Sequence, residues 1–282
     1  MFKKKKRFSP LALLGLSISV CSIIISIFLA GEAQSFFDLK SLFITVGSTL
    51  GAFLFSFPFE TIRNFFPVIK KAFTSSALNL EKDIDTLVTL SEVAKKQGLL
   101  NLERDLDRYT DDKFLKKGIL NIIDNKDVDQ LKEIMETEMY FMNRRHKKGR
   151  SMIEMIAATA PSLGLLGTYI GLIPMLINLD DPESLGPYMA IELVTSFYGA
   201  FIAFIIFSPM SKKLKALDDD EMIQKELLLK GLVGIKEGRN PRMLREELSN
   251  FVACSSMKMK KRLDKKSDSE GSETNKSFKK SA

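Results

Sequence analysis

One apolar stretch of the chain combines an acid with two hydroxyl side chains. Glu192 is followed by Thr195 and Ser196, in a segment from Ser184 to Ser211 that holds no other charged residue. Residues three and four positions apart share one face of a helix, so the carboxylate and both hydroxyls point in one direction. A charge at the centre of a membrane helix costs about 2.5–3.5 kcal/mol, and ionisable residues there usually serve function. Oxygens grouped in this way could replace part of the water shell of a cation.

A second apolar stretch contributes another hydroxyl, that of Thr168. If the two stretches cross a membrane antiparallel, with outer ends near Asn178 and Pro187, Thr168 and Thr195 lie about 15 and 12 Å below the same surface. The hydroxyls would then reach similar depths. Two plainer interpretations stay open. Each hydroxyl could bond only to a carbonyl of its own helix, and Glu192 could reach water at the outer boundary by extending its side chain.

Two prolines belong to the same pair of stretches. Pro161 removes a backbone hydrogen bond inside the first of them, so we expect a kink there. Pro209 lies at the inner end of the second, where a simple helix terminus would also explain it.

The segments that hold these residues are long enough to cross a bilayer as helices, for which about 20 mostly apolar residues are needed. We predict an all-α integral membrane protein with four transmembrane helices, at about 11–30, 39–59, 152–178 and 187–210. Basic residues precede the first and third spans and follow the second and fourth. The short loops that join the first span to the second, and the third to the fourth, are mainly acidic. This distribution places both termini and 60–150 in the cytoplasm. A cleaved signal peptide over 1–33 is the alternative, but its apolar run would be unusually long.

The polar segments outside the four spans are also predicted to be helical. Apolar residues in 60–150 recur at helical spacing, and Asp127 is a suitable N-cap for a helix that could continue into the third span. The predicted organisation is a hairpin in 1–59, a helical cytoplasmic domain in 60–150, a second hairpin in 151–211, cytoplasmic helices in 212–263 and a disordered tail in 264–282.

Several function classes lack their signatures in this sequence. It contains no phosphate-binding loop, no nucleophile elbow and no Cys/His metal spacing, so we expect neither an enzyme nor a cofactor. The charges of 60–150 nearly balance, which argues against nucleic acid as a partner. The basic cluster around His146 is most simply a contact with lipid headgroups.

Longer motifs carry a family resemblance. The runs 159–173 and 186–200 resemble the third and fourth spans of flagellar stator A-subunits of the MotA/PomA type, and 94–103 and 238–241 resemble their cytoplasmic segments. The resemblance implies a pentameric ring in the bacterial inner membrane, around a MotB-type partner that is anchored to peptidoglycan. It also implies that passage of H⁺ or Na⁺ drives torque on the rotor protein FliG for motility.

The resemblance assigns roles to individual residues. Thr168, Thr195, Ser196 and Glu192 would belong to the ion pathway, and Pro161 and Pro209 would serve coupling. Lys95, Lys96 and Glu103 would face the rotor.

The sequence departs from the family pattern at three places. Glu192 stands where a small apolar residue is usual, and Ser196 stands for a threonine typical of sodium-driven subunits, although Thr168 keeps the sodium-type residue. Ala158 replaces a common acid, with Glu154 one turn earlier. A TonB- or Tol-linked proton-channel module is the alternative function, but such relatives generally have three spans. A membrane scaffold whose polar groups only pack is a third.

Overall fold

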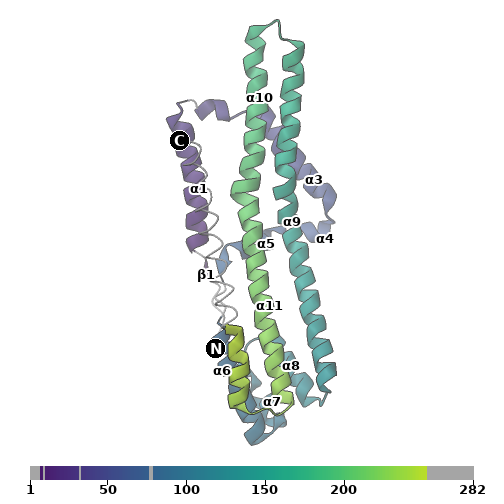
Figure 1. Ribbon diagram of the computed structural model, residues 1–282. Helices are drawn as coiled ribbons and strands as arrows, with labels where there is room; N and C mark the ends of the chain where they lie inside the picture. Colours follow the sequence, from purple (N-terminus) through teal and green to yellow (C-terminus); the bar gives the residue numbers. More distant parts are fainter. Residues whose placement is uncertain (1–6, 9, 32, 76–78, 253–282) are drawn as a thin grey trace, which may run out of the picture. The chain divides into compact units, whose positions relative to one another are not determined.

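The computed structural model describes residues 7–8, 10–31, 33–75 and 79–252. The chain divides into two compact units. We call the described residues within 4–76 and 141–219 the membrane unit, and those within 77–140 and 220–252 the polar unit. Figure 1 shows the elements of both.

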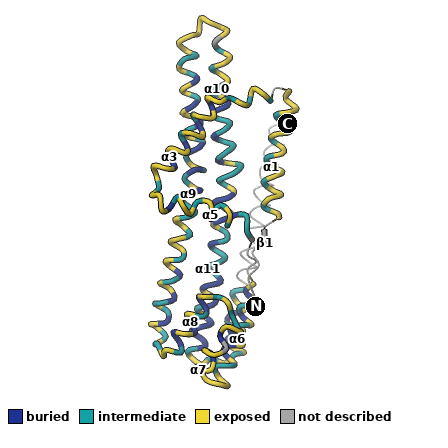
Figure 2. The backbone as a smooth tube through the Cα atoms, turned by 180° about the vertical axis from the view of Figure 1, so that it is seen from behind, coloured by how far each residue is buried: buried dark blue, intermediate teal, exposed yellow. Residues whose placement is uncertain are grey.

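Two apolar helical segments open the membrane unit. The first is α1 (Pro10–Leu29), which buries none of its residues and is mostly exposed in Figure 2. A 3₁₀ turn, η1 (Ala33–Phe36), leads to the second, which consists of α2 (Leu39–Leu42), the π-helix η2 (Phe43–Gly47) and α3 (Ser48–Ser56). Asp38 caps its first turn by accepting a hydrogen bond of 2.7 Å from the Ser41 N–H.

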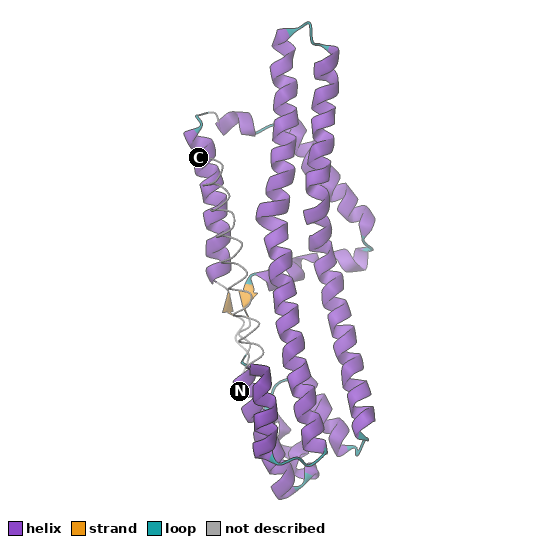
Figure 3. Ribbon diagram, in the orientation of Figure 1, coloured by secondary structure: helices purple, strands orange, loops and turns teal. Residues whose placement is uncertain are grey.

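Short elements follow the second span. They are α4 (Phe59–Ile62), α5 (Phe65–Ala72) and the strand β2 (Thr74–Ser75), which pairs antiparallel with β1 (Arg7–Phe8). These two-residue strands are the small orange elements of Figure 3, and the rest of the described regular structure is helical. The all-α fold is therefore confirmed.

The remaining apolar segments belong to very long helices. α9 (Val128–Ile177) is 50 residues long and stays helical through Pro161, while the expected kink there stays a prediction. The Val128 N–H donates a 2.8 Å hydrogen bond to the Asp127 carboxylate. The expected continuation of this helix into the third span is confirmed. The fourth span begins as α10 (Pro182–Ala200), passes through the π-helix η3 (Phe201–Phe207) and continues as α11 (Ser208–Lys236).

Length and composition identify four helical segments that could cross a membrane, within Pro10–Leu29, Ala33–Ser56, Val128–Ile177 and Leu185–Lys236.

Pro209 does not end its helix, because α11 continues beyond it. A proline leaves the carbonyl four residues earlier without its usual donor, and here the preceding seven residues adopt the wider π turn.

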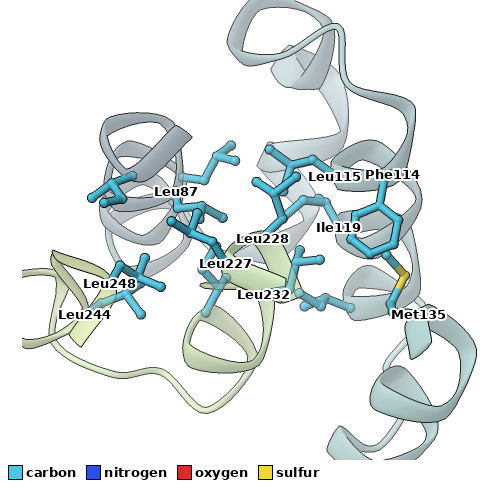
Figure 4. Close-up of a cluster of buried hydrophobic side chains, with 14 of the residues drawn as sticks. Leu87, Phe114, Leu115, Ile119, Met135, Leu227, Leu228, Leu232, Leu244 and Leu248 are labelled. Atoms are coloured by element: carbon cyan, nitrogen blue, oxygen red, sulfur yellow. The ribbon is translucent and has the colours of Figure 1, made fainter. Parts of the chain in front are cut away.

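The polar unit has its own apolar core (Figure 4). It is built from α6 (Leu80–Gln97), α7 (Leu99–Tyr109), α8 (Lys113–Ile123), the start of α9, the end of α11 and a helical segment at 241–252. Fully or nearly buried side chains from these elements meet, including Leu87, Ile119, Met135, Leu228 and Leu248. The C-terminal helices thus pack with 79–140, whereas 60–75 and 141–150 group with the spans. The predicted tail at 264–282 lies outside the described residues.

One ion pair fastens α11 to α8 inside this unit. The Asp112 carboxylate caps α8 by accepting bonds from the Phe114 and Leu115 N–H groups, and Lys225 Nζ lies 2.9 Å from its Oδ2. Burial raises the pKa of the Asp112 carboxyl, but Lys225 and the backbone donors outweigh burial and hold that pKa below its ordinary value of 3.8.

Candidate functional site

The predicted ion-handling residues lie where α9 and α10 run side by side, as both views of the molecule show (Figures 1 and 2). Glycines permit the close approach. A Cβ atom added to Gly167 would lie 2.5 Å from Thr195 Cβ, and one added to Gly199 would lie 2.6 Å from the Ala160 carbonyl oxygen. Gly164 and Gly171 are in similarly tight contact with α10. Small residues are the usual means by which membrane helices come this close.

Thr195 is the buried centre of this contact and has no exposed surface. Its Oγ1 donates to carbonyls of its own helix, with the Ile191 oxygen at 2.8 Å and the Glu192 oxygen at 3.0 Å. Its own carbonyl accepts a 3.2 Å hydrogen bond from Thr45 Oγ1 in η2. The second span is therefore held against the fourth by a buried hydroxyl, at the place where the second span adopts a π turn.

The other three residues of the predicted group lie around this centre. Thr168 Oγ1 donates to the Leu165 carbonyl at 2.7 Å on an exposed face, and Ser196 is half-buried. Glu192 is also half-buried, and its Cβ would lie 3.3 Å from a Cβ on Gly171. In the described part of the chain, no side chain pairs with the Glu192 carboxylate.

The hydroxyls of Thr168 and Thr195 thus bond within their own helices, which is the plainer of the two interpretations considered from sequence. This bonding does not remove a binding role. A hydroxyl that donates a hydrogen bond keeps its lone pairs. With these it can accept another hydrogen bond or coordinate a cation. The contacts of Gly167 with Thr195 and of Gly171 with Glu192 also place Thr168 on α9 between the levels of these two α10 residues. The expected match in depth agrees with this packing.

A second polar cluster, which the sequence analysis missed, surrounds a buried carboxylate in α11. Asp218 is 5% exposed and lies within reach of three nitrogen-bearing side chains, two of them cationic. Arg150 Nη1 is at 3.1 Å, His146 Nδ1 at 3.3 Å and Lys71 Nζ at 3.6 Å. Burying a carboxylate is costly unless it is paired, so these contacts hold α5, α9 and α11 together in the membrane unit.

The basic cluster around His146 was interpreted from sequence as a lipid-headgroup contact. In the structure its members Arg150 and His146 turn toward Asp218 instead, and lipid contact by this cluster stays a proposal. The available signal was the acidic run 218–220, which follows the fourth span closely. Composition alone could not show that its first member is buried.

Comparisons with known proteins fit this arrangement of spans. A model of the MotA/TolQ/ExbB proton channel family matches residues 107–227. The chain is 38% identical over 250 residues to the uncharacterized protein YtxD of Bacillus subtilis, covering 87% of this chain and 91% of that protein. It is 35% identical over 251 residues to Motility protein A of Treponema pallidum, covering 89% and 95%. The chain belongs to the MotA/PomA family.

A solved structure extends the match to three dimensions. The flagellar MotAB stator complex from Bacillus subtilis aligns with a TM-score of 0.77 at 26% identity, covering 85% of this chain and 95% of the matched one. This MotA/PomA-family chain is accordingly a membrane protein of the inner membrane and a subunit of a flagellar stator ion channel.

Ala158 departs from the MotA/PomA pattern, in which an acid is common at this position. Glu154, the nearest acid to the position of Ala158, is already engaged. Its Oε1 accepts from Arg150 Nε at 3.0 Å and from Ser211 Oγ at 3.2 Å. It therefore joins the cluster around Asp218, and it does not stand free to replace the missing acid of the family.

The charged residues matched to the rotor-facing segment of MotA/PomA proteins gather at the corner between α6 and α7. Gly98 makes this corner with φ of 84°, a conformation that favours glycine. Lys95 and Lys96 are exposed in the last turn of α6, and Glu103 is exposed on α7. Within the described ranges, none of the three side chains has an ion-pair partner. We call these three residues the charged corner.

Proposed function

We propose that this chain works with a MotB-type partner as an ion-driven torque generator of the flagellar motor. The observation that supports this most strongly is the structural match to a flagellar MotAB stator complex along 85% of the chain. In that role the protein performs no catalytic turnover and needs no resident cofactor. The energy comes from the ion gradient, since one elementary charge crossing 100 mV releases about 2.3 kcal/mol.

The ion pathway runs along the face of α10 that carries Glu192, Thr195 and Ser196, with Thr168 of α9 beside it. The buried bonding of Thr195 supports a fixed geometry, because its hydrogen is committed to carbonyls of its own helix. H⁺ or Na⁺ passes these oxygens on its way to an acid supplied by the partner. Pro161 and Pro209 lie in the two helices that form the pathway and serve the coupling of ion passage to movement.

The assembly is a ring of copies of this chain, five by the family resemblance, with both termini in the cytoplasm. Its charged corner meets the rotor protein FliG. Exposed ion pairs contribute about 0–1 kcal/mol each, which suits contacts that must form and break at every step. The exposure of Lys95, Lys96 and Glu103, and the absence of ion-pair partners for them within the described ranges, support this assignment.

The test is motility after deletion of this chain. We expect flagella that assemble normally but do not rotate, and complementation should restore swimming. Removing sodium at fixed proton-motive force then identifies the ion, because a sodium-driven motor stops and a proton-driven motor continues. Deletion mutants that lack filaments, or that swim normally in a strain without another stator, would contradict the proposal. Normal swimming with a weakened cell envelope would favour the TonB- or Tol-linked alternative.

A further inference from the structure

An apolar cleft lies in the membrane unit, away from the ion pathway. It has a volume of about 250 Å³ and is bounded by α1, the end of α5 and the junction of η3 with α11. Its walls are almost entirely apolar, with Leu11 and Leu16 from α1, Phe73 after α5, and Ile205, Ile206 and Met210 from the fourth span. Gly15 of α1 also lines it, and a Cβ added there would meet no atom within 4 Å. The cleft therefore has room along α1.

One cation lines this apolar cleft. Lys213 of α11 lines it, and its Nζ atom is buried and has no hydrogen-bond partner among the described residues. The adjacent Lys212, by contrast, is exposed. An ammonium group removed from water without a partner is strongly unfavourable, so the arrangement calls for an anion from outside the chain.

The depth of Lys213 indicates where that anion comes from. It lies three residues beyond Met210, at about 4.5 Å further along the helix axis, and Met210 ends the predicted fourth span. With the predicted end of the span at Met210, the ammonium would lie at the level of the phosphate groups, and the rest of the cleft would face acyl chains. The neighbouring α1 buries none of its residues, so its apolar side chains also require hydrocarbon contact.

We propose that this cleft binds an anionic phospholipid, with its phosphate on Lys213 and one acyl chain along α1 and η3. The headgroup carries no uncompensated cation of its own, as in a glycerol headgroup. A choline headgroup would bring a second fixed cation next to the buried ammonium, whereas a glycerol headgroup leaves the phosphate charge free to pair with it. By the distribution of basic residues, the lipid belongs to the cytoplasmic leaflet.

The experiment uses the full-length chain, purified from membranes with its native subunits and stripped of lipid by detergent. Dioleoyl-phosphatidylglycerol or dioleoyl-phosphatidylcholine is added back, and bound lipid is counted by native mass spectrometry. We expect tighter binding of phosphatidylglycerol. Lys213→Gln should weaken that binding about tenfold, through loss of one charge-assisted contact, and Lys212→Gln should leave it unchanged.

A second pair of variants tests the acyl-chain half of the site. Gly15→Phe places a ring in the open space of the cleft and should reduce retention of both lipids. Leu14→Phe is the matched control, because Leu14 is 57% exposed and does not line the cleft. Since a Cβ at Gly15 meets no atom within 4 Å and Leu14 is exposed, the variants remain informative even if Lys213→Gln fails to assemble.

Each of the following results would overturn the proposal. The first is equal binding of the two lipids by the wild-type protein, and the second is equal behaviour of the Lys213 and Lys212 variants. The third is undiminished lipid binding by Gly15→Phe. The first two results together would point to an acidic side chain of a neighbouring subunit as the partner of Lys213. Glycerol phosphate without acyl chains should not compete, and if it does, the site is for a soluble phosphate.

Discussion

Thr195 packs the helices together and also lies in the proposed ion pathway. Its hydroxyl hydrogen is used within α10, its carbonyl receives Thr45 from the second span, and its Cβ fills the space left by Gly167. Glu192, one turn earlier, packs near Gly171 through its Cβ, but its carboxylate is not held in this way. It is the half-buried acid of the proposed pathway, and its carboxylate finds no partner among the described residues. We therefore expect ion passage to be more sensitive to substitution of Glu192, and helix packing to be more sensitive to substitution of Thr195.

Replacing Glu192 by Gln should change the response of the motor to ions more than its assembly. The amide has the shape of the acid but neither its charge nor its ability to bind a proton. We expect slower rotation and an altered dependence of speed on pH or sodium, measured on tethered cells at normal protein levels. Glu183→Gln, at an exposed position of the same loop–helix region, is the control and should rotate normally.

Wild-type speeds for Glu192→Gln across both the pH and the sodium series would exclude a part for this carboxylate in ion passage. In that case the acid would be a boundary residue that reaches water, which is the plainer interpretation left open by the sequence.

At the level of single residues, sequence reasoning found groups that share one helix face but not groups that meet across helices. Glu192, Thr195 and Ser196 follow from their spacing alone. The pairing of Asp218 with Arg150, His146 and Lys71 brings together residues far apart in the chain, and no local pattern encodes it. The bond from Thr45 to Thr195 escaped prediction for the same reason.

Among the elements, α9 and α10 depend on glycine to reach their separation. The Gly199 position shows this most directly, because its neighbour is backbone and cannot rotate away. Gly51 in α3 offers a contrast, since a Cβ there would meet nothing within 4 Å. The same residue type thus has a packing role in one span and none in another within the described structure.

Gly199→Ala should destabilise the membrane unit, although alanine favours helix by about 1 kcal/mol over glycine. The new methyl group would lie 2.6 Å from the Ala160 carbonyl oxygen and force the helices apart. Overpacking of this kind costs about 1–3 kcal/mol. We expect a lower thermal midpoint for the purified complex, whereas Gly51→Ala should leave the midpoint unchanged or raise it. Equal midpoints for the two variants would contradict the close contact.

Hydropathy predicted the four spans because composition decides whether a helix can enter a bilayer. It could not predict the π-helices η2 and η3, since an apolar run has the same composition in an α turn and a π turn. Pro209 was a partial signal. It indicated a break or terminus, and the observed solution is a wider turn just before it.

For the whole molecule, linear domain boundaries were too simple. The sequence analysis placed 60–150 and 212–263 in separate cytoplasmic parts, whereas residues from both share the core that includes Leu87, Ile119 and Leu228. Helical spacing predicted each amphipathic helix, but not which apolar faces would meet. That pairing depends on packing between segments more than 100 residues apart, as in the contact of Lys225 with Asp112.

Reversing charges at the charged corner should weaken rotor coupling and spare the channel. Neither Lys95 nor Glu103 has a partner within the described protein, so Lys95→Glu with Glu103→Lys should not disturb the fold of the polar unit. We expect reduced torque at unchanged ion conductance and protein level. Arg242→Glu, an exposed charge on the 241–252 helix of the same unit, is the control. Unchanged motility of the double variant would remove this corner from the rotor contact.

The π-helix η3 changes the direction in which side chains point along the fourth span. A π turn accommodates one residue more than an α turn, and one residue corresponds to about 100° of rotation around a helix axis. A helical wheel drawn straight through Phe201–Phe207 therefore assigns the wrong outward direction to everything beyond it. Removing one residue from η3 would swing Lys213 and Asp218 around the axis relative to Glu192, without changing the hydropathy of the span.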